Sequence, residues 1–179
     1  MSRPGLGDEI KKRNAFDCLE QEAALNLART GDRIQAPFAR LFKAHGITGA
    51  QYNVLRILRG AGEALSCQEV AGRMITQVPD VTRLVDRLEE AGLVERSRTL
   101  QDRRLVLTAV TEAGLRLLKA LDDPVVDLHR AQFGHLTSDE LAELNRLLVK
   151  ARRQAGPDVE ANDRPTNAAD RGGTADRGD

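Results

Sequence analysis

Four arginines lie within nine residues of the chain, in the stretch RSRTLQDRR at 96–104, with one aspartate and no lysine. A guanidinium is permanently charged and presents its N–H donors in a planar fork, so it binds phosphates and the edges of nucleic-acid bases. Short apolar runs flank the stretch, which predicts that it forms the tip of a β-hairpin. Because the whole chain has 27 basic and 27 acidic residues, this concentration of arginine indicates a local surface for an anionic partner such as DNA.

The composition bounds the protein class. The chain has 179 residues, of which 41% are hydrophobic and 30% charged, as is typical of one globular domain. No apolar run reaches the roughly 18 residues of a membrane span, and the beginning of the sequence lacks the apolar core of a signal peptide. We therefore expect a soluble cytoplasmic protein. The two cysteines, Cys18 and Cys67, do not have the spacing of a disulfide framework or a zinc site, and we expect neither metal nor cofactor.

The two ends of the chain differ from its body. Residues 1–15 contain Pro4, Gly5 and Gly7 and are expected to form a flexible arm. Residues 155–179 carry six acids against three arginines and offer little to bury, which predicts a disordered acidic tail. Without that tail the chain has 24 basic and 21 acidic residues, a net charge of +3 that is compatible with nucleic-acid binding.

Sequence signals for the starts of helices occur at three places in the chain before the tail. In a capping box, a hydroxyl and a side chain three residues later satisfy free N–H groups of the first turn. The three such pairs are Thr48 with Gln51, Ser66 with Glu69, and Thr137 with Glu140. Apolar spacing predicts helices over about 16–44, 50–59, 67–74, 81–91 and 138–153, with strands near 93–98 and 104–110. Thr111 can cap a further long helix that carries Leu115 to Leu128.

Glycines and prolines adjust these boundaries. Gly31, Pro37 and Pro124 are candidate interruptions or kinks, whereas Gly46, Gly60 and Gly92 are expected helix stops. Pro79 suits the first turn of a helix, so the helix over 81–91 could begin as early as Thr76 or Gln77. Asp80 could cap that helix or accept a hydrogen bond from cytosine. The order of elements predicts a mainly α fold with a small β-hairpin wing, the winged helix-turn-helix.

Two stretches then resemble the MarR family of bacterial transcription regulators. They are VTRLVDRLEEAGLVER at 81–96 and DRRLVLTAVTEAG at 102–114. The resemblance covers residues 16–154 and implies a DNA-binding lobe at 46–110, with dimerisation helices at 16–45 and 111–154. It further implies a homodimer, most often a repressor, on a pseudo-palindromic duplex site, released by a small anionic or phenolic effector. Arg40 and His45 could line an effector cleft, but the effector site stays unassigned.

We expect twelve residues to form the DNA-binding surface. They are Ser66, Gln68, Thr76, Gln77, Thr82, Arg83, Arg87, Arg96, Arg98, Asp102, Arg103 and Arg104. The resemblance places Thr82 and Arg83 on bases and phosphates.

It also places Arg104 in the minor groove, oriented by Asp102; a narrow minor groove concentrates negative potential and favours an inserted guanidinium. Arg96, Arg98 and Arg103 are expected on phosphates, which position a protein without reading sequence.

The sequence does not favour an enzyme or a binder of single-stranded nucleic acid. His45, His129 and His135 are scattered and adjoin no nucleophile or acid, so an enzyme is not predicted. Aromatic residues make up only 3% of the chain, which disfavours single-strand or RNA binding. Two alternatives stay open: a thiol-based redox sensor using Cys18, with Tyr52 as the one tyrosine to support it, and a winged-helix interaction module without DNA binding.

Overall fold

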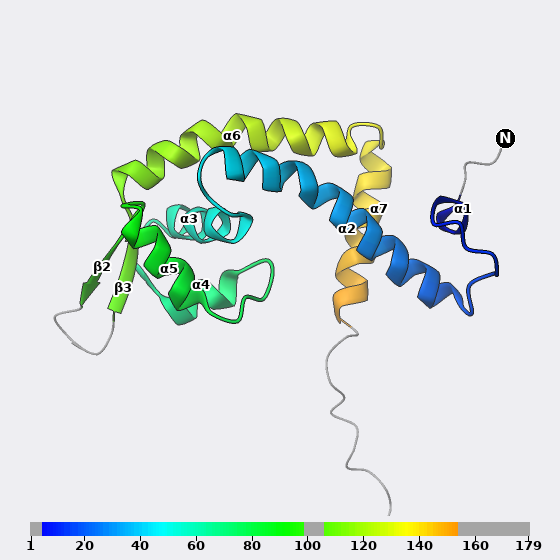
Figure 1. Ribbon diagram of the computed structural model, residues 1–179, viewed down its shortest axis with the longest axis horizontal. Coiled ribbons are helices and arrows are strands. Elements are labelled where there is room, and N and C mark those ends of the chain that lie inside the picture. Colours follow the sequence, from blue (N-terminus) through cyan, green and yellow to red (C-terminus); the bar gives the residue numbers. More distant parts are fainter. Residues whose placement is uncertain (1–4, 99–105, 154–179) are drawn as a thin grey trace, which may run out of the picture. The chain divides into compact units, whose positions relative to one another are not determined.

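The computed structural model describes residues 5–98 and 106–153 (Figure 1). The elements are α1 (Leu6–Glu9), α2 (Leu19–Ala44), α3 (Gly49–Ala61), β1 (Leu65–Ser66), α4 (Cys67–Arg73), α5 (Val81–Glu90), β2 (Val94–Arg98), β3 (Val106–Val110), α6 (Glu112–Phe133) and α7 (Ser138–Arg153). The chain divides into two compact units, Met1–His135 and Leu136–Asp179. The predicted fold class, mainly α with a small β wing, is confirmed. The wing tip at 99–105 and the tail at 155–179 lie outside the described residues.

The sheet has one more strand than the sequence predicts. Its three antiparallel strands lie in the order β1-β3-β2, with Thr108 of β3 paired to Leu65 of β1 on one side and to Arg96 of β2 on the other. With only two residues, β1 is too short to show the alternation by which a strand is predicted. It connects α3 to α4 and closes one edge of the wing.

The core lies around α3. Leu55 and Leu58 are buried almost completely, and α4, α5 and α6 each bring apolar side chains against them. The other core side chains with 0% exposure are Val54, Val70, Val85, Leu88, Leu118 and Leu121. Each belongs to an apolar stripe at helical spacing. We call α3, α4, α5 and the three strands the lobe.

The predicted capping boxes are present. In each, the hydroxyl oxygen accepts from a backbone N–H three residues on: Thr48 from Gln51 at 3.2 Å, Ser66 from Glu69 at 3.3 Å and Thr137 from Glu140 at 3.3 Å. Gly46 and Gly92 adopt φ values of 75° and 68° just after α2 and α5, as expected of helix stops.

Several boundaries differ from the prediction. Helix α3 continues through Gly60 and stops at Gly62, which has a φ of 70°. Helices α2 and α6 run without a break through Pro37 and Pro124. Helix α5 begins only at Val81, because Asp80 caps it by accepting from the Arg83 N–H at 2.9 Å.

The predicted arm contains one short helix among its described residues. Helix α1 lies beside the start of α2, and Leu6 is only 5% exposed. Glu9 of α1 pairs with Arg29 of α2 at 2.9 Å. The sequence did not predict this helix or these contacts.

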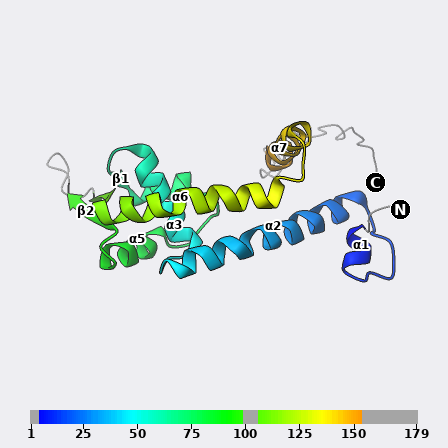
Figure 2. The ribbon, with the colours of Figure 1, turned by 90° about the horizontal axis from the view of Figure 1, so that it is seen from above.

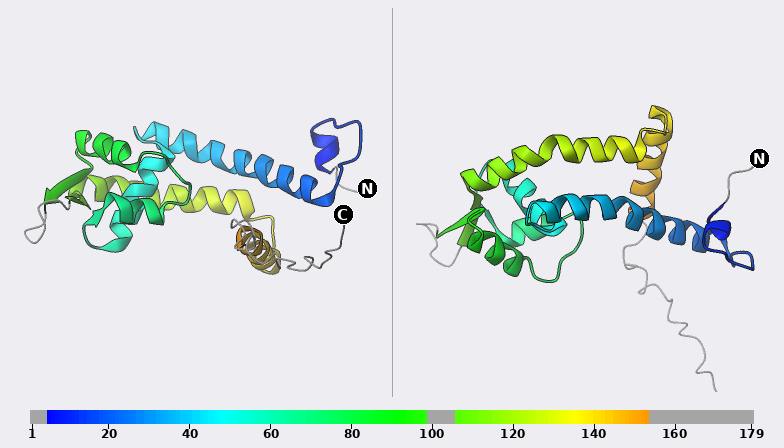
Figure 3. Two further views of the ribbon diagram at one scale, coloured as in Figure 1. Left: turned by 90° about the horizontal axis from the view of Figure 1, so that it is seen from below. Right: turned by 45° about the horizontal axis from the view of Figure 1, so that its top comes forward.

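Two long helices run past the lobe. Helices α2 and α6 pack against each other, and Figures 2 and 3 show them running side by side. Within α7, the second unit's helix, no residue is buried, and Arg146 pairs with Glu143 at 2.6 Å. Among the described residues, no helix is long and apolar enough to cross a membrane.

Candidate nucleic-acid interface

The exposed side of α5 has two ridges. Residues three and four apart in a helix lie one above the other, so Arg83, Arg87 and Glu90 form one ridge and Thr82, Asp86 and Glu89 form the next. Arg83 and Arg87 are both exposed, whereas Val81, Val85 and Leu88 are buried on the opposite side. The lobe therefore holds α5 by its apolar stripe and leaves two guanidiniums free to meet a partner.

Arg96 of β2 covers the second ridge. Its Nη1 lies 2.6 Å from Asp86 Oδ1 and 3.3 Å from Glu89 Oε2, and its Nη2 donates to the Thr82 carbonyl oxygen at 3.3 Å. The side chain is only 22% exposed. Burial disfavours the charged guanidinium, but the hydrogen bond and charge of Asp86, with the charge of Glu89, prevail, so the pKa of Arg96 is raised.

We call the contacts of Arg96 with Asp86, Glu89 and the Thr82 carbonyl the Arg96 clasp. The sequence did not predict them. The sequence places Arg96 among the phosphate contacts, whereas here its donors are directed to α5. The acids it pairs with lie ten and seven residues earlier in the chain, on another element, so only the folded arrangement of β2 beside α5 brings them together. By pairing with Asp86 and Glu89, Arg96 offsets part of the negative charge on the surface that Arg83 and Arg87 share.

The wing is anchored where it leaves and rejoins the helices. Thr111 donates through its hydroxyl to the Gly92 carbonyl at 2.8 Å, and its backbone N–H donates to the Leu93 carbonyl at 3.1 Å. The same hydroxyl accepts from the Gly114 N–H at 3.2 Å, which caps α6. A Cβ at Gly114 would overlap the Leu93 carbonyl oxygen and a Val110 methyl, so only glycine allows this close approach.

The remaining predicted residues are distributed over the lobe. Ser66 caps α4, and Gln68 is exposed in its first turn. The Ser66 N–H and hydroxyl both donate to Glu69 Oε2 at 2.8 Å, and these bonds, the backbone one foremost, lower the pKa of Glu69.

Thr76 and Gln77 are exposed in the loop before α5, and not in its first turn. Arg98 is exposed at the end of β2. Asp102, Arg103 and Arg104 lie outside the described residues.

Cys18 lies far from Tyr52, the tyrosine that was expected to support it. It is exposed at the N-cap of α2, and the other cysteine, Cys67, belongs to α4. Tyr52 stacks on Phe42 at the opposite end of α2, with ring centroids 4.4 Å apart. Since α2 has 26 residues, about 39 Å separates its two ends, so Tyr52 cannot support Cys18 within one chain.

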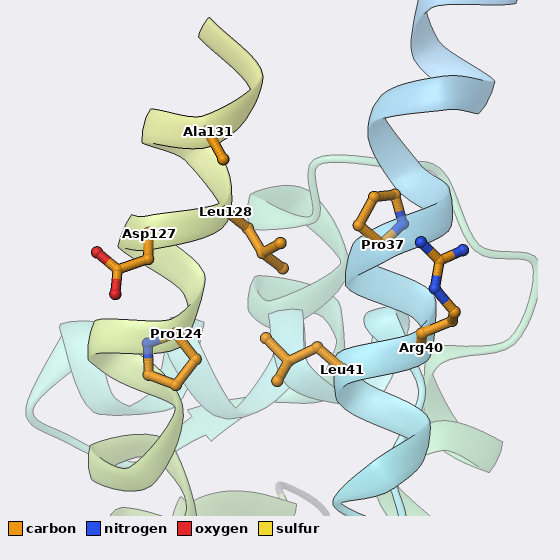
Figure 4. A pocket seen from close by; sticks show the side chains of 7 residues that line it. All are labelled: Pro37, Arg40, Leu41, Pro124, Asp127, Leu128 and Ala131. Carbon is orange, nitrogen blue, oxygen red and sulfur yellow. The ribbon is translucent and has the colours of Figure 1, made fainter. Parts of the chain in front are cut away.

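A groove lies between α2 and α6 (Figure 4). Its volume is about 480 Å³. Its lining residues are Pro37, Arg40, Leu41, Pro124, Asp127, Leu128 and Ala131. The sequence suggested Arg40 and His45 for an effector cleft. Arg40 lines this groove, and His45 is not among its lining residues. His45 Nδ1 lies 3.0 Å from the Leu41 carbonyl oxygen.

The lobe matches a known sequence family. Residues 47–106 match the MarR family. Over 122 residues the chain is 30% identical to the HTH-type transcriptional repressor IacR of Pseudomonas putida, covering 68% of this chain and 72% of that protein. The chain belongs to the MarR family.

Solved MarR structures share the fold. A MarR transcription factor from Planctomyces limnophilus is 46% identical, with a TM-score of 0.59 over 76% of this chain and 99% of that one. A mutant MarR of Escherichia coli, solved in complex with operator DNA, is 27% identical, with a TM-score of 0.66 over 83% and 99% of the two chains. The prediction of a DNA-binding transcription regulator, and not an enzyme, is confirmed by these relatives.

In this MarR protein, replacing Arg96 by glutamine should remove the ion pairs that join strand β2 to α5. We expect a loss of about 1–2 kcal/mol in the free energy of unfolding, because charge-assisted hydrogen bonds are removed from a largely buried side chain. Urea denaturation followed by circular dichroism measures this. Arg98→Gln on the same strand is the matched control, since that side chain is exposed. An equal loss in both variants would contradict the clasp.

Proposed function

We propose that the protein is a homodimeric repressor that binds a pseudo-palindromic duplex and is released by a small anionic or phenolic molecule. The observation that carries the proposal is the ridge of Arg83 and Arg87 on a helix whose other side is fixed in the core. Arginine donates two hydrogen bonds to guanine in the major groove, which a recognition helix enters. The operator complex of the related Escherichia coli MarR supports the same ligand class.

The other predicted contacts have supporting roles in this proposal. Arg104, oriented by Asp102, enters the minor groove, while Arg98 and Arg103 meet phosphates. Thr82 contacts bases from the ridge nearer the wing. The DNA phosphate backbone is approached from the start of α4 by Ser66 and Gln68, and from the loop before α5 by Thr76 and Gln77. Arg96 acts through α5 and not through the DNA.

The partner in the proposed dimer is a second copy of the chain, which would cover exposed apolar side chains of α2 and α6. Leu19, Leu25 and Leu27 of α2 are 80%, 42% and 49% exposed, and Val126 of α6 is 42% exposed. Apolar side chains in such a series along two neighbouring helices gain by being covered. A two-fold dimer would place its recognition helices about 34 Å apart, one turn of duplex.

The groove between α2 and α6 is the site we propose for the effector. Prolines and leucines supply apolar contacts, and the guanidinium of Arg40 can bind a carboxylate or phenolate. A planar aromatic acid matches both features.

DNA binding is tested by fluorescence anisotropy with the full chain. The duplex comes from the intergenic region beside its own gene, and a scrambled duplex is the control. We expect selective binding whose salt dependence reports roughly six to ten phosphate contacts. Arg104→Ala should weaken this binding without loss of folding. Failure of the protein to bind either duplex at low salt, together with an inert Arg104→Ala, would leave the interaction module as the better account.

Release is tested by adding benzoate to the preformed complex. We expect the fraction bound to fall, and Arg40→Ala to require more benzoate. Repeating the titration with oxidant and reductant tests Cys18: release by oxidant alone, abolished by Cys18→Ser, would replace the small-molecule proposal with the thiol sensor.

A further inference from the structure

Ile75 lies in the loop between α4 and α5, residues 74–80, and is 80% exposed. Val106 of β3 is the next most exposed large apolar residue in the described lobe, at 38%. Figure 1 shows this loop on the side of the lobe away from β2 and β3. A single apolar side chain on a surface is common, so the support and the position of Ile75 decide whether it has a function.

The loop is anchored on both sides of Ile75. Met74 and Val78 are partly buried, and both pack against the core. At the end of the loop, Asp80 caps α5 by accepting from the Arg83 N–H at 2.9 Å. Ile75 therefore projects from a backbone that is tied to the core before and after it. A side chain presented in this way loses less conformational freedom when it meets a partner than one on a loose loop does.

The position of Ile75 is next to the proposed contacts with bases. The N-terminal end of a recognition helix is the part that reaches base edges in the major groove, and the loop of Ile75 leads into that end of α5. The loop has one charged residue, Asp80, whose Oδ1 is already bonded in the cap. An isoleucine can neither donate to phosphates nor bond base heteroatoms. On the major-groove edges of the base pairs, the methyl group of thymine is the apolar group that it can contact.

We propose that Ile75 contacts the methyl group of a thymine in the major groove and so selects a T·A pair at one position in each half of the duplex site. The inference deepens the proposed function and rests on it. Arg83 and Arg87 recognise guanine through hydrogen bonds, and Ile75 adds recognition of an apolar group that their guanidiniums do not supply. Because the proposed dimer has two-fold symmetry, the selected thymines form a symmetric pair.

Removing thymine methyl groups one position at a time tests this contact. The duplex comes from the intergenic region beside the gene, and each thymine is replaced in turn by deoxyuridine, which still pairs with adenine and lacks only the methyl group. We expect the full chain to bind about fourfold more weakly when a contacted methyl is removed, the value of one buried carbon. Fluorescence anisotropy at a fixed salt concentration measures each affinity.

The same series with Ile75→Ala identifies the methyl that this side chain contacts. The variant should bind the unmodified duplex about fivefold to tenfold more weakly, because most of an aliphatic side chain is removed. At the contacted thymines, deoxyuridine should cause no further loss in this variant, whereas the effects at the other thymines should persist. Ile75→Val keeps a branched side chain and should retain most of the sensitivity. Both variants should unfold at the temperature of the parent, since Ile75 is exposed.

Ile10→Ala is the matched control, because it makes the same change at a residue that is 40% exposed at the end of α1, outside the lobe. It should keep the affinity of the parent and its response to every deoxyuridine. If Ile75→Ala binds as the parent does, or is equally sensitive to deoxyuridine at every position, the contact is overturned. Selective binding with no thymine linked to Ile75 would refute this inference alone. A protein that binds no duplex selectively would refute the proposed function, and the inference with it.

Discussion

Replacing Gly114 by alanine should destabilise the protein by about 3 kcal/mol, the upper part of the range for overpacking a buried site. The added methyl would overlap the Leu93 carbonyl oxygen and a methyl of Val110. Backbone cannot rotate away as a flexible side chain can, so the start of α6 must shift and weaken the bonds of Thr111. Thermal unfolding should show a fall in Tm of roughly 6–12 °C.

Gly60→Ala is the control, because it makes the same chemical change in a helix with space around it. No atom lies within 4 Å of a Cβ at Gly60, and α3 runs through this position. Alanine has the higher helix propensity, so we expect a gain of about 0.5–1 kcal/mol. Effects of the same sign in the two variants would contradict our account of the close approach at Gly114.

Replacing Arg83 or Arg87 by alanine should weaken binding to the selective duplex by about 10-fold to 100-fold each, the value of a bidentate contact to a base. Neither side chain belongs to the core, so the unfolding midpoint should stay close to that of the parent. Fluorescence anisotropy at a fixed salt concentration measures the loss. Binding to the scrambled duplex should fall much less, because base contacts carry the selectivity.

Arg33→Ala removes the same charge from a different part of the molecule. Arg33 has a side chain that is 68% exposed on α2, and it lies 3.9 Å from Glu9. This variant should keep nearly all of its affinity. If it lost as much as Arg83→Ala, overall charge and not the recognition helix would govern binding.

Sequence reasoning found the starts of helices better than their ends. A start such as Thr48 is encoded by one hydroxyl and one partner three residues later, so a local pattern determines it. The end of α3 was placed at Gly60 because that is the first glycine after the apolar stripe. Only the backbone conformation shows that Gly62, with its positive φ, ends the helix.

Of the interface, the sequence predicted the helix that carries Arg83 and Arg87, and in the structure both side chains are exposed. It could not predict the partners of Arg96. The local sequence around an arginine on a wing is the same whether its side chain contacts phosphates or the acids of a neighbouring helix. Strand β1 and helix α1 were missed for a related reason: each is stabilised by tertiary contacts and not by its own pattern.

The junction at Thr111 has a consequence for how such proteins diversify. Because Thr111 is bonded to Gly92 and Leu93, the two ends of the wing are joined at one point of the lobe. Because both ends are fixed there, a change in the length of the wing costs little loop entropy and leaves this junction unchanged. Under the proposed function, a longer or shorter wing would change its reach toward DNA while α5 stays in place.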